Sequence, residues 1–366
     1  MLLALKEIQR EKLRYSLIII LIALISYMMF ILSALALGLA NQNTSAIYGW
    51  QADSIALNEQ ADGVLRASML TEPQISEIKH HTDGETAEIG FTSTRLITSS
   101  DVKESVNFLG VEKDSFISKR IDLAQGHAPQ KSHEIVLDQA LTKTADISLN
   151  DTVTLGSDEN TYTVVGIAKD AKLSVVSVAY GLLEDWRNIS PVAPTIQASG
   201  VVSTKSFTSN DGTIDTAADG TANDAVSVFT IPQFIQLLPG YNAQNTTFVL
   251  MIAVLAIVTL IIIAVFLYII VLQKLPNIAV LKAQGIPTSY LIRSTLLQGL
   301  LVVGIGLFIG ILATIATALP LPMSVPMSFS LPIQGATALG LLLMGLLGAL
   351  LPSRQIRRVD PVSLMQ

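Results

Sequence analysis

Phe248–Leu272 reads FVLMIAVLAIVTLIIIAVFLYIIVL and contains 25 residues, none of them charged. Folded as an α-helix with a rise of ~1.5 Å per residue, this stretch measures roughly 38 Å, which is more than the ~30 Å hydrocarbon core of a bilayer. It therefore predicts a transmembrane helix that is either tilted or projects beyond the bilayer at one end.

Three further windows lack Asp, Glu, Lys and Arg and are long enough to cross a membrane as helices. Half of the 366 residues are hydrophobic and the mean hydropathy is +0.54, which is unusual for a water-soluble protein. The four predicted transmembrane helices comprise residues 16–40, 248–272, 294–319 and 333–351. The polar residues 41–245 between the first two are numerous enough to form a domain with its own core.

Basic residues near the spans indicate which side of the membrane each segment occupies. Ten Lys or Arg residues lie in 1–15, 273–293 and 352–366, against three acidic residues, whereas the connection 320–332 carries no charge. Because cytosolic loops carry the excess of Lys and Arg, we expect both termini and the 273–293 segment to be cytosolic. Residues 41–245 hold 13 basic and 26 acidic residues, and we place them outside the cytosol.

Alternating and β-branched residues predict strands in this extracytoplasmic domain. We expect strands at 87–98, 106–111, 134–136 and within 151–167, and short helices at 69–81 and 232–238. This mixture predicts an α+β domain inserted between the first and second helices of a membrane α-helical protein. Residues 199–223 are rich in Ser, Thr, Asp, Gly and Ala, and we expect them to form a mobile loop.

Residue types that would support catalysis or a resident metal are sparse. The chain has no cysteine, which excludes disulfides and thiolate metal sites. Its histidines have no metal-binding spacing such as HExxH, so we expect surface histidines rather than a metal site. They are His80, His81, His127 and His133. With no convincing set of catalytic residues, we expect a protein that is not an enzyme and has no intrinsic cofactor.

The sequence also limits how the protein could be energised. It contains no phosphate-binding loop of the GxxxxGKS or GxxxxGKT type. The four predicted spans lack ionisable side chains, which ion-driven transporters usually need at membrane depth. A transporter built in this way would draw its energy from a separate ATPase that contacts residues 273–293. Residues 1–15 are amphipathic and basic, and we expect either a helix on the inner leaflet or a simple basic anchor.

The segment after the second span predicts a short cytosolic helix. We expect Pro276 to end the transmembrane helix and Asn277 to cap a new helix at 278–284. Its apolar residues Ile278 and Leu281 form a face of the right size for a groove on a soluble partner. A simple connector is the alternative.

Small residues predict where the membrane helices approach each other closely. Gly306 and Gly310 form a GxxxG pair in the third span, and the fourth span holds a similar pair of small residues. Such pairs favour close packing within one subunit or between subunits. Ser26 and Ser33 lie two turns apart on one face of the first span, and we expect this face to pack on another helix.

Two motifs give the chain a resemblance to a known family. Residues 278–285, IAVLKAQG, are similar to the E-I-G-V-L-K-A-x-G type of coupling segment in the FtsX-like (type VII, macrolide-exporter-like) permeases of ABC transporters. Asn277 and Ala279 stand where Glu and Gly are usual. The tail 356–366, IRRVDPVSLMQ, resembles the family's R-V-D-P-x-E-A-L motif, with Ser363 in place of Glu. The order of the spans and the outer domain fits this family over nearly the full length.

Within this family the chain is similar to haem-efflux permeases of Gram-positive bacteria. The stretches that carry this similarity are LALKEIxxxKLRY, MMFILSALALGLAxxN and LPLPMSVPMSFSLP. The resemblance implies a homodimer in the plasma membrane that works with two cytosolic ATPase subunits and removes haem from the membrane. It also implies that the ATPase binds ATP and magnesium, that haem is the substrate, that lipid surrounds the spans and that nucleic acid is not a partner.

Haem export suggests particular residues, because haem iron accepts Met sulfur, His nitrogen or Tyr oxygen. The candidate ligands are Tyr27, Met28 and Met29, near the middle of the first span. The candidate walls of the haem site are Phe30, Phe266 and Tyr268. The predicted ATPase-coupling residues are Asn277, Ile278, Val280, Leu281, Lys282 and Gly285.

Other interpretations stay open at the level of the sequence. The methionine pair also fits ordinary lipid-facing or packing residues. The same machine could export another amphiphile, such as an antimicrobial peptide or a lipid. A third possibility is FtsX-like regulation of a cell-wall hydrolase.

Overall fold

The structure is a computed structural model that describes residues 12–156, 160–190, 192–209, 211–216, 225–320 and 325–358, with side chains up to residue 350. The chain divides into two compact units, a bundle of long helices and a domain formed by Leu39–Gln244. The expected helix at 1–15 lies almost wholly outside the described residues, as does most of the 352–366 tail.

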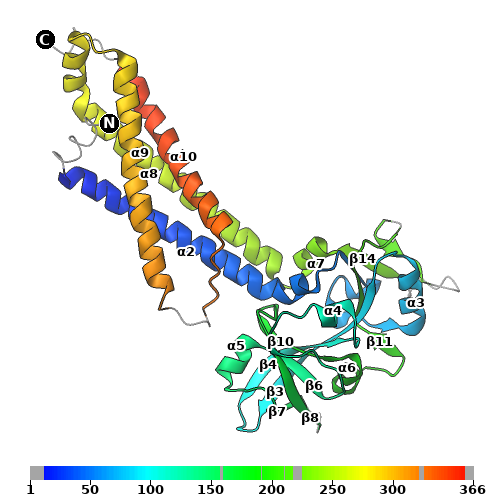
Figure 1. The fold of residues 1–366 in the computed structure, drawn as a ribbon. Coiled ribbons are helices and arrows are strands. Elements are labelled where there is room, and N and C mark those ends of the chain that lie inside the picture. Colours follow the sequence, from blue (N-terminus) through cyan, green and yellow to red (C-terminus); the bar gives the residue numbers. More distant parts are fainter. Residues whose placement is uncertain are drawn as a thin grey trace. The chain divides into compact units, whose positions relative to one another are not determined.

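Four long helices form the first unit (Figure 1). They are α2 (Lys12–Trp50), α8 (Tyr241–Ala283), α9 (Thr288–Ala318) and α10 (Leu331–Arg358). Each contains a stretch that is long and apolar enough to cross a membrane. The start of α2, the α8–α9 connection and the end of α10 lie at one end of the bundle, as expected for four successive antiparallel crossings. The four predicted transmembrane helices are confirmed.

The GxxxG pair of α9 packs against α2 within the same subunit. A Cβ atom added at Gly306 would lie 2.7 Å from Cγ2 of Ile22, and one added at Gly310 would lie 2.8 Å from Cβ of Ser26. The absence of side chains at the two glycines therefore sets the distance between these helices. Ser26 is fully buried at this contact, so the expected packing of its face on another helix is confirmed.

The expected helix break at Pro276 is wrong. Helix α8 continues through Pro276 and ends at Ala283, so residue 277 caps no new helix. A proline removes one backbone donor, but a membrane helix tolerates this where neighbouring groups satisfy the freed carbonyl. The end of α8 is set by Gly285, which adopts φ +86°. The N–H of Gly285 donates to the carbonyl of Lys282 at 2.9 Å and that of Ile286 to the carbonyl of Leu281 at 3.1 Å, a Schellman motif.

The second unit is built on a mixed sheet of 12 strands. Their order is β13-β14-β1-β12-β3-β4-β10-β6-β8-β5, with β7 paired to β3 and β8, and β9 paired to β10. The strands of this sheet are β1 (Ser54–Asn58), β3 (Thr86–Thr98), β4 (Lys103–Val111), β5 (Leu123–Gly126), β6 (Glu134–Asp138), β7 (Thr152–Leu155), β8 (Thr161–Ala168), β9 (Lys172–Leu173), β10 (Val176–Leu182), β12 (Gly200–Ser203), β13 (Thr213–Ile214) and β14 (Val226–Thr230). Strand pairs β4–β10 and β6–β8 are parallel and the other pairs are antiparallel.

Short helices and one small sheet complete this domain. The helices are α3 (Glu72–His80), α4 (Phe116–Lys119), α5 (Gln139–Thr144), α6 (Leu183–Ile189) and α7 (Ile231–Leu237), with 3-10 turns η1 (Glu59–Ala61) and η2 (Leu65–Ala67). Strands β2 (Leu70–Thr71) and β11 (Ile196–Ala198) pair separately. The outer end of α2 belongs to the domain core, because Ile47 and Trp50 are buried among residues of the large sheet. The predicted α+β domain is confirmed.

One expectation for this domain is wrong in part. Within the expected loop 199–223, residues 200–203 form β12, which pairs with both β1 and β3 near the centre of the sheet. Its valines, Val201 and Val202, are fully buried. The segment looks like a loop in sequence because only two of its four residues are large and apolar. Residues 210 and 217–223 of the same stretch lie outside the described part of the chain.

Candidate functional site

The candidate haem ligands on α2 point in different directions. Met29 and Phe30 are 4% and 3% exposed and pack with Leu307 of α9 and Leu341 of α10. Their side chains fill the interior of the helix bundle within one subunit. In this arrangement Met29 sulfur is not available to a ligand outside the bundle, and Phe30 is not a wall of an open site.

Tyr27 and Met28 lie away from this interior. Met28 is 51% exposed and Tyr27 is half-buried. Among the residues that the structure describes, the Tyr27 hydroxyl has no hydrogen-bond partner within its own subunit. A phenol at mid-membrane depth is stabilised by a polar partner. Tyr27 and Met28 thus offer a hydroxyl and a thioether on the outer surface of a single subunit.

The aromatic residues predicted to line the site lie on α8. Phe266 is partly buried against the bundle interior, whereas Tyr268 is 36% exposed. Tyr268 thus shares the partial exposure of Tyr27 and Met28, whereas Phe266 contributes to packing inside the bundle.

The predicted ATPase-coupling residues fall on two faces of the end of α8. Ile278 is 8% exposed and packs with Val271 of α8 and Leu291 of α9. Leu281 packs at the edge of the same cluster. Ile278 is therefore covered by the chain's own helices, whereas Leu281 is half-buried. Contrary to the expectation from sequence, Ile278 is not free for a partner.

The opposite face of this segment is exposed. Asn277, Val280 and Gln284 lie at helical spacing on the exposed side, and Val280 is 49% exposed. Gly285 is also exposed and no atom lies within 4 Å of where its Cβ would be, while Lys282 is half-buried. This face presents one aliphatic side chain between two amides, next to the sharp turn that begins α9.

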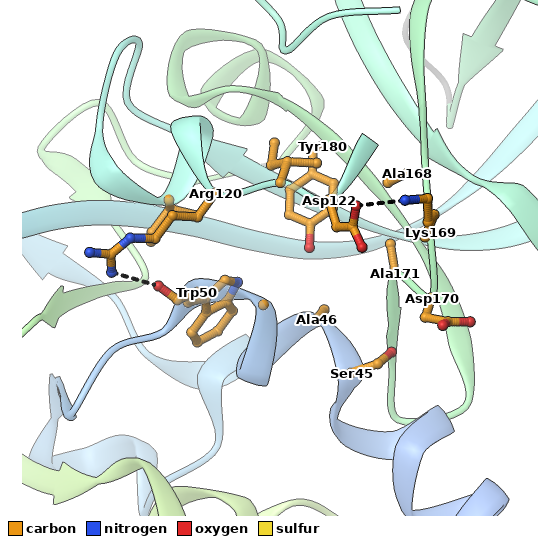
Figure 2. A pocket seen from close by; sticks show the side chains of 13 residues that line it. Ser45, Ala46, Trp50, Arg120, Asp122, Ala168, Lys169, Asp170, Ala171 and Tyr180 are labelled. Atoms are coloured by element: carbon orange, nitrogen blue, oxygen red, sulfur yellow. Dashed lines mark hydrogen bonds and ion pairs between the residues drawn. The ribbon is translucent and has the colours of Figure 1, made fainter. Parts of the chain in front are cut away.

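The outer domain contains a cavity of about 170 Å³ (Figure 2). In this cavity Lys169 pairs with Asp122 at 3.1 Å, and Arg120 donates to the Trp50 carbonyl at 3.3 Å. The Tyr180 hydroxyl points into it. Burial raises the pKa of Tyr180 above its usual range, so the phenol stays neutral. Pockets for drug-sized ligands usually measure ~300–1,000 Å³, so this cavity is too small to enclose a large amphiphile.

Buried carboxylates in the outer domain are held by hydrogen bonds. Asp138 accepts from the Ser177 hydroxyl at 2.8 Å and from the Ala171 amide at 3.1 Å, while burial raises its pKa. Asp185 accepts from the His133 amide at 3.1 Å, and burial raises its pKa as well. Among the described residues, no three His, Asp or Glu side chains come together as a metal site. These carboxylates support the fold of the domain.

Comparison with known proteins agrees with this architecture. A family model described as MacB-like periplasmic core domain matches residues 16–227, more than half of the chain, and one described as FtsX-like permease C-terminal matches residues 249–361. The chain belongs to the FtsX-like permeases with a MacB-like domain. An FtsX-like permease is the membrane subunit of an ABC-type transporter rather than a catalytic enzyme, and four apolar helices make this one a multi-pass membrane protein.

Two full-length relatives of this FtsX-like permease carry the same name, "Putative hemin transport system permease protein HrtB". The protein from Staphylococcus haemolyticus is 26% identical over 360 residues, which is 98% of this chain and 97% of the relative. The protein from Staphylococcus epidermidis is 26% identical over 363 residues, with the same coverage. Among solved structures, the periplasmic region of MacB from Actinobacillus actinomycetemcomitans matches with a TM-score of 0.35 and 15% identity, over 52% of this chain and 94% of that one.

The resemblance inferred from the coupling and tail motifs is thereby confirmed at the level of the family. The sequence did not predict a polar contact between helices at the end of the bundle near the α8–α9 connection, where Tyr15, Lys274 and Gln298 meet. Tyr15 is separated from Lys274 by 259 residues and from Gln298 by 283, so no local pattern in the sequence indicates this contact.

Proposed function

We propose that this FtsX-like permease is the membrane subunit of an ATP-driven exporter that removes haem from the membrane. The observation that carries the proposal is the full-length similarity to two relatives named for hemin transport. The proposal extends their named substrate to this chain and adds the direction of transport, out of the membrane and away from the cell.

The chemistry of α2 supports a haem substrate. Haem is flat and apolar, and its iron binds thioether sulfur or phenol oxygen. Met28 and Tyr27 present these two groups on the outside of the subunit at membrane depth, whereas Met29 is enclosed by its own bundle. We therefore assign ligand roles to Met28 and Tyr27, and a packing role to Met29.

The exporter is proposed to be a homodimer. Exposed apolar residues recur along α2 at helical spacing: Leu13, Leu17, Ile20, Leu24 and Met28. A second copy against this stripe would bring two Met28 side chains towards one membrane cleft, open to lipid at its sides. Such a cleft suits a substrate that enters from the bilayer better than an aqueous pore does.

Energy is proposed to come from a cytosolic ATPase that docks at the end of α8. The excess of Lys and Arg in residues 1–15, 273–293 and 352–366 supports a cytosolic location for these segments. The exposed face of Asn277, Val280 and Gln284 is the proposed contact, since helices commonly dock into grooves of partner proteins. Because α8 is unbroken from Tyr241 to Ala283, movement of the docked end would displace the whole transmembrane helix.

Titration of the purified permease with haem in detergent tests the substrate. We expect a saturable shift of the Soret band that is weakened or altered in Met28→Ala and retained in Met29→Leu, the matched control on the adjacent buried position. A spectrum that equals haem in empty micelles would reject haem and favour another amphiphile. Capture and activation of a cell-wall hydrolase by the outer domain, without haem binding, would favour a regulatory role instead.

A further inference from the structure

At one end of the bundle, three helices meet in a network of hydrogen bonds. Nζ of Lys274 on α8 donates to the Tyr15 hydroxyl on α2 at 3.0 Å and to Oε1 of Gln298 on α9 at 3.4 Å. Nε2 of Gln298 donates to the same Tyr15 hydroxyl at 2.6 Å. The ammonium group also lies 5.6 Å from the centre of the Tyr15 ring. We call Tyr15, Lys274 and Gln298 the inner clamp.

Two of the three clamp residues are enclosed, while Lys274 is half-buried. Tyr15 is 1% exposed and Gln298 is 6% exposed. The Tyr15 side chain packs in the same cluster as Ile18 of α2, Leu267 of α8 and Val302 of α9. A polar group in such surroundings pays a desolvation cost when its partner is lost. The three helices are therefore held in one arrangement at this point, and any other arrangement must supply new partners.

Three other buried hydroxyl groups of the bundle bond within their own helices. Ser33 donates to the carbonyl of Met29, Thr259 to that of Leu255 and Thr314 to that of Gly310, each on its own helix. A further contact between α2 and α8 lies beside the clamp, where Arg14 Nη1 donates to Gln273 Oε1 at 2.7 Å. Two polar contacts between α2 and α8 thus lie side by side at this end of the bundle. A third joins the two helices near their other ends, where Asn43 Nδ2 donates to Gln244 Oε1 at 3.4 Å.

The position of the clamp links two parts of the proposed transporter. Lys274 precedes the exposed coupling face at Asn277 by three residues on the same unbroken helix. Tyr15 precedes Tyr27 by 12 residues on α2, which corresponds to roughly 18 Å along the helix. We propose that the inner clamp transmits movement of the cytosolic end of α8 to α2, and thereby to the Tyr27–Met28 surface. This inference rests on the proposed function, because it presupposes an ATPase that moves α8.

The test uses the full-length permease with its co-expressed ATPase in lipid nanodiscs. Because the chain has no cysteine, Tyr48→Cys introduces a single labelling site at an exposed position of α2 that lies outside the stripe proposed for the dimer. An environment-sensitive fluorophore at this site reports movement of α2 when ATP is added, with no need for haem. Tyr15→Phe removes the shared hydroxyl but keeps the ring, and Thr314→Val removes a buried hydroxyl that bonds only to its own helix.

We expect Tyr15→Phe to reduce the ATP-dependent fluorescence change at least fivefold while ATP hydrolysis stays within twofold of the parent, and Thr314→Val to leave both unchanged. An undiminished change in Tyr15→Phe, or no change in the parent, would overturn the clamp. If Tyr15→Phe lost the fluorescence change and ATP hydrolysis to the same extent and also had a lowered melting temperature, Tyr15 would have a structural role alone, and the proposal would be overturned.

The same samples separate failure of the clamp from failure of the haem assignment. If the parent shows ATP-dependent movement of α2 that Tyr15→Phe loses, yet haem is not bound, the clamp stands and the substrate assignment falls. Conversely, if haem binding is normal and Tyr15→Phe moves like the parent, the substrate assignment stands and the clamp falls.

Discussion

Replacing Gly310 by alanine tests whether the GxxxG pair of α9 is used inside one subunit. The added Cβ would lie 2.8 Å from Cβ of Ser26 and 3.0 Å from the backbone oxygen of Ala23. Favourable carbon–carbon contacts begin at ~3.5 Å, so α2 and α9 would have to separate by about 0.7 Å. Neither neighbouring atom is the far end of a flexible side chain, and so the strain cannot be relieved by a rotamer change.

Overpacking of this kind costs about 1–3 kcal/mol. The matched control is Gly304→Ala in the same helix, where no atom lies within 4 Å of the added Cβ. Both variants gain the same helix propensity of alanine over glycine, so their difference isolates the contact with α2. We therefore expect Gly310→Ala to be about 1–3 kcal/mol less stable than Gly304→Ala.

Reversible unfolding in mixed micelles of detergent and sodium dodecyl sulfate measures this difference by circular dichroism. Equal free energies of unfolding for the two alanine variants would refute the packing of α9 on α2. A dimer that dissociates while each subunit keeps its stability would instead assign the GxxxG pair to an interface between subunits.

Three further predictions concern single side chains. Met29→Ala should lower the free energy of unfolding by about 2–5 kcal/mol, whereas Met28→Ala at an exposed position should change it by less than ~0.5 kcal/mol. The same micelle titration measures both values, and equal losses would contradict the burial of Met29 and the exposure of Met28. Val280→Asp should abolish stimulation of the ATPase without lowering thermal stability, whereas Ile278→Asp should lower thermal stability. Pull-down of the ATPase and calorimetry measure the two effects, and a Val280→Asp variant that is unstable but still stimulates the ATPase would contradict this assignment. Burial raises the pKa of Asp138 above 3.8, so the native state binds this proton more tightly than the unfolded state does. The contribution of Asp138 to the free energy of unfolding is therefore lost as pH rises from about 4 through the raised pKa. Urea unfolding across this range should show a smaller decline in the free energy of unfolding for Asp138→Asn than for the parent, and an identical pH profile for the two proteins would refute the reasoning.

Much of the fold could be predicted because its signals are local. Uncharged windows of about 20 residues or more are sufficient to identify membrane helices, and alternation identified the long strand β3 at Thr86–Thr98. Strand β12 was missed because its four residues are defined by pairing with β1 and β3, more than 100 residues earlier. No pattern within GVVS carries that information.

The candidate site was less predictable, since it depends on contacts between helices. Met28 and Met29 are adjacent and point about 100° apart on a helix, and sequence alone does not say which one meets the bundle interior. The contact of Gly310 with Ser26 fixes the rotation of α2 and thereby buries Met29. In the same way, the coupling motif does not indicate that Leu291 covers Ile278. Pro276 was expected to end a helix, as it does in water-soluble proteins, but α8 continues through it, which membrane helices tolerate.

We propose above that this permease uses ATP, hydrolysed by its partner, to remove haem from a membrane. The most direct measurement is the haem content of proteoliposomes that contain the permease and its ATPase, followed by absorbance while an external haem-binding protein captures what is released. We expect haem to leave the vesicles with ATP and not with a non-hydrolysable analogue, and Met28→Ala to slow this loss. Stimulated ATP hydrolysis with no ATP-dependent loss of haem would contradict it.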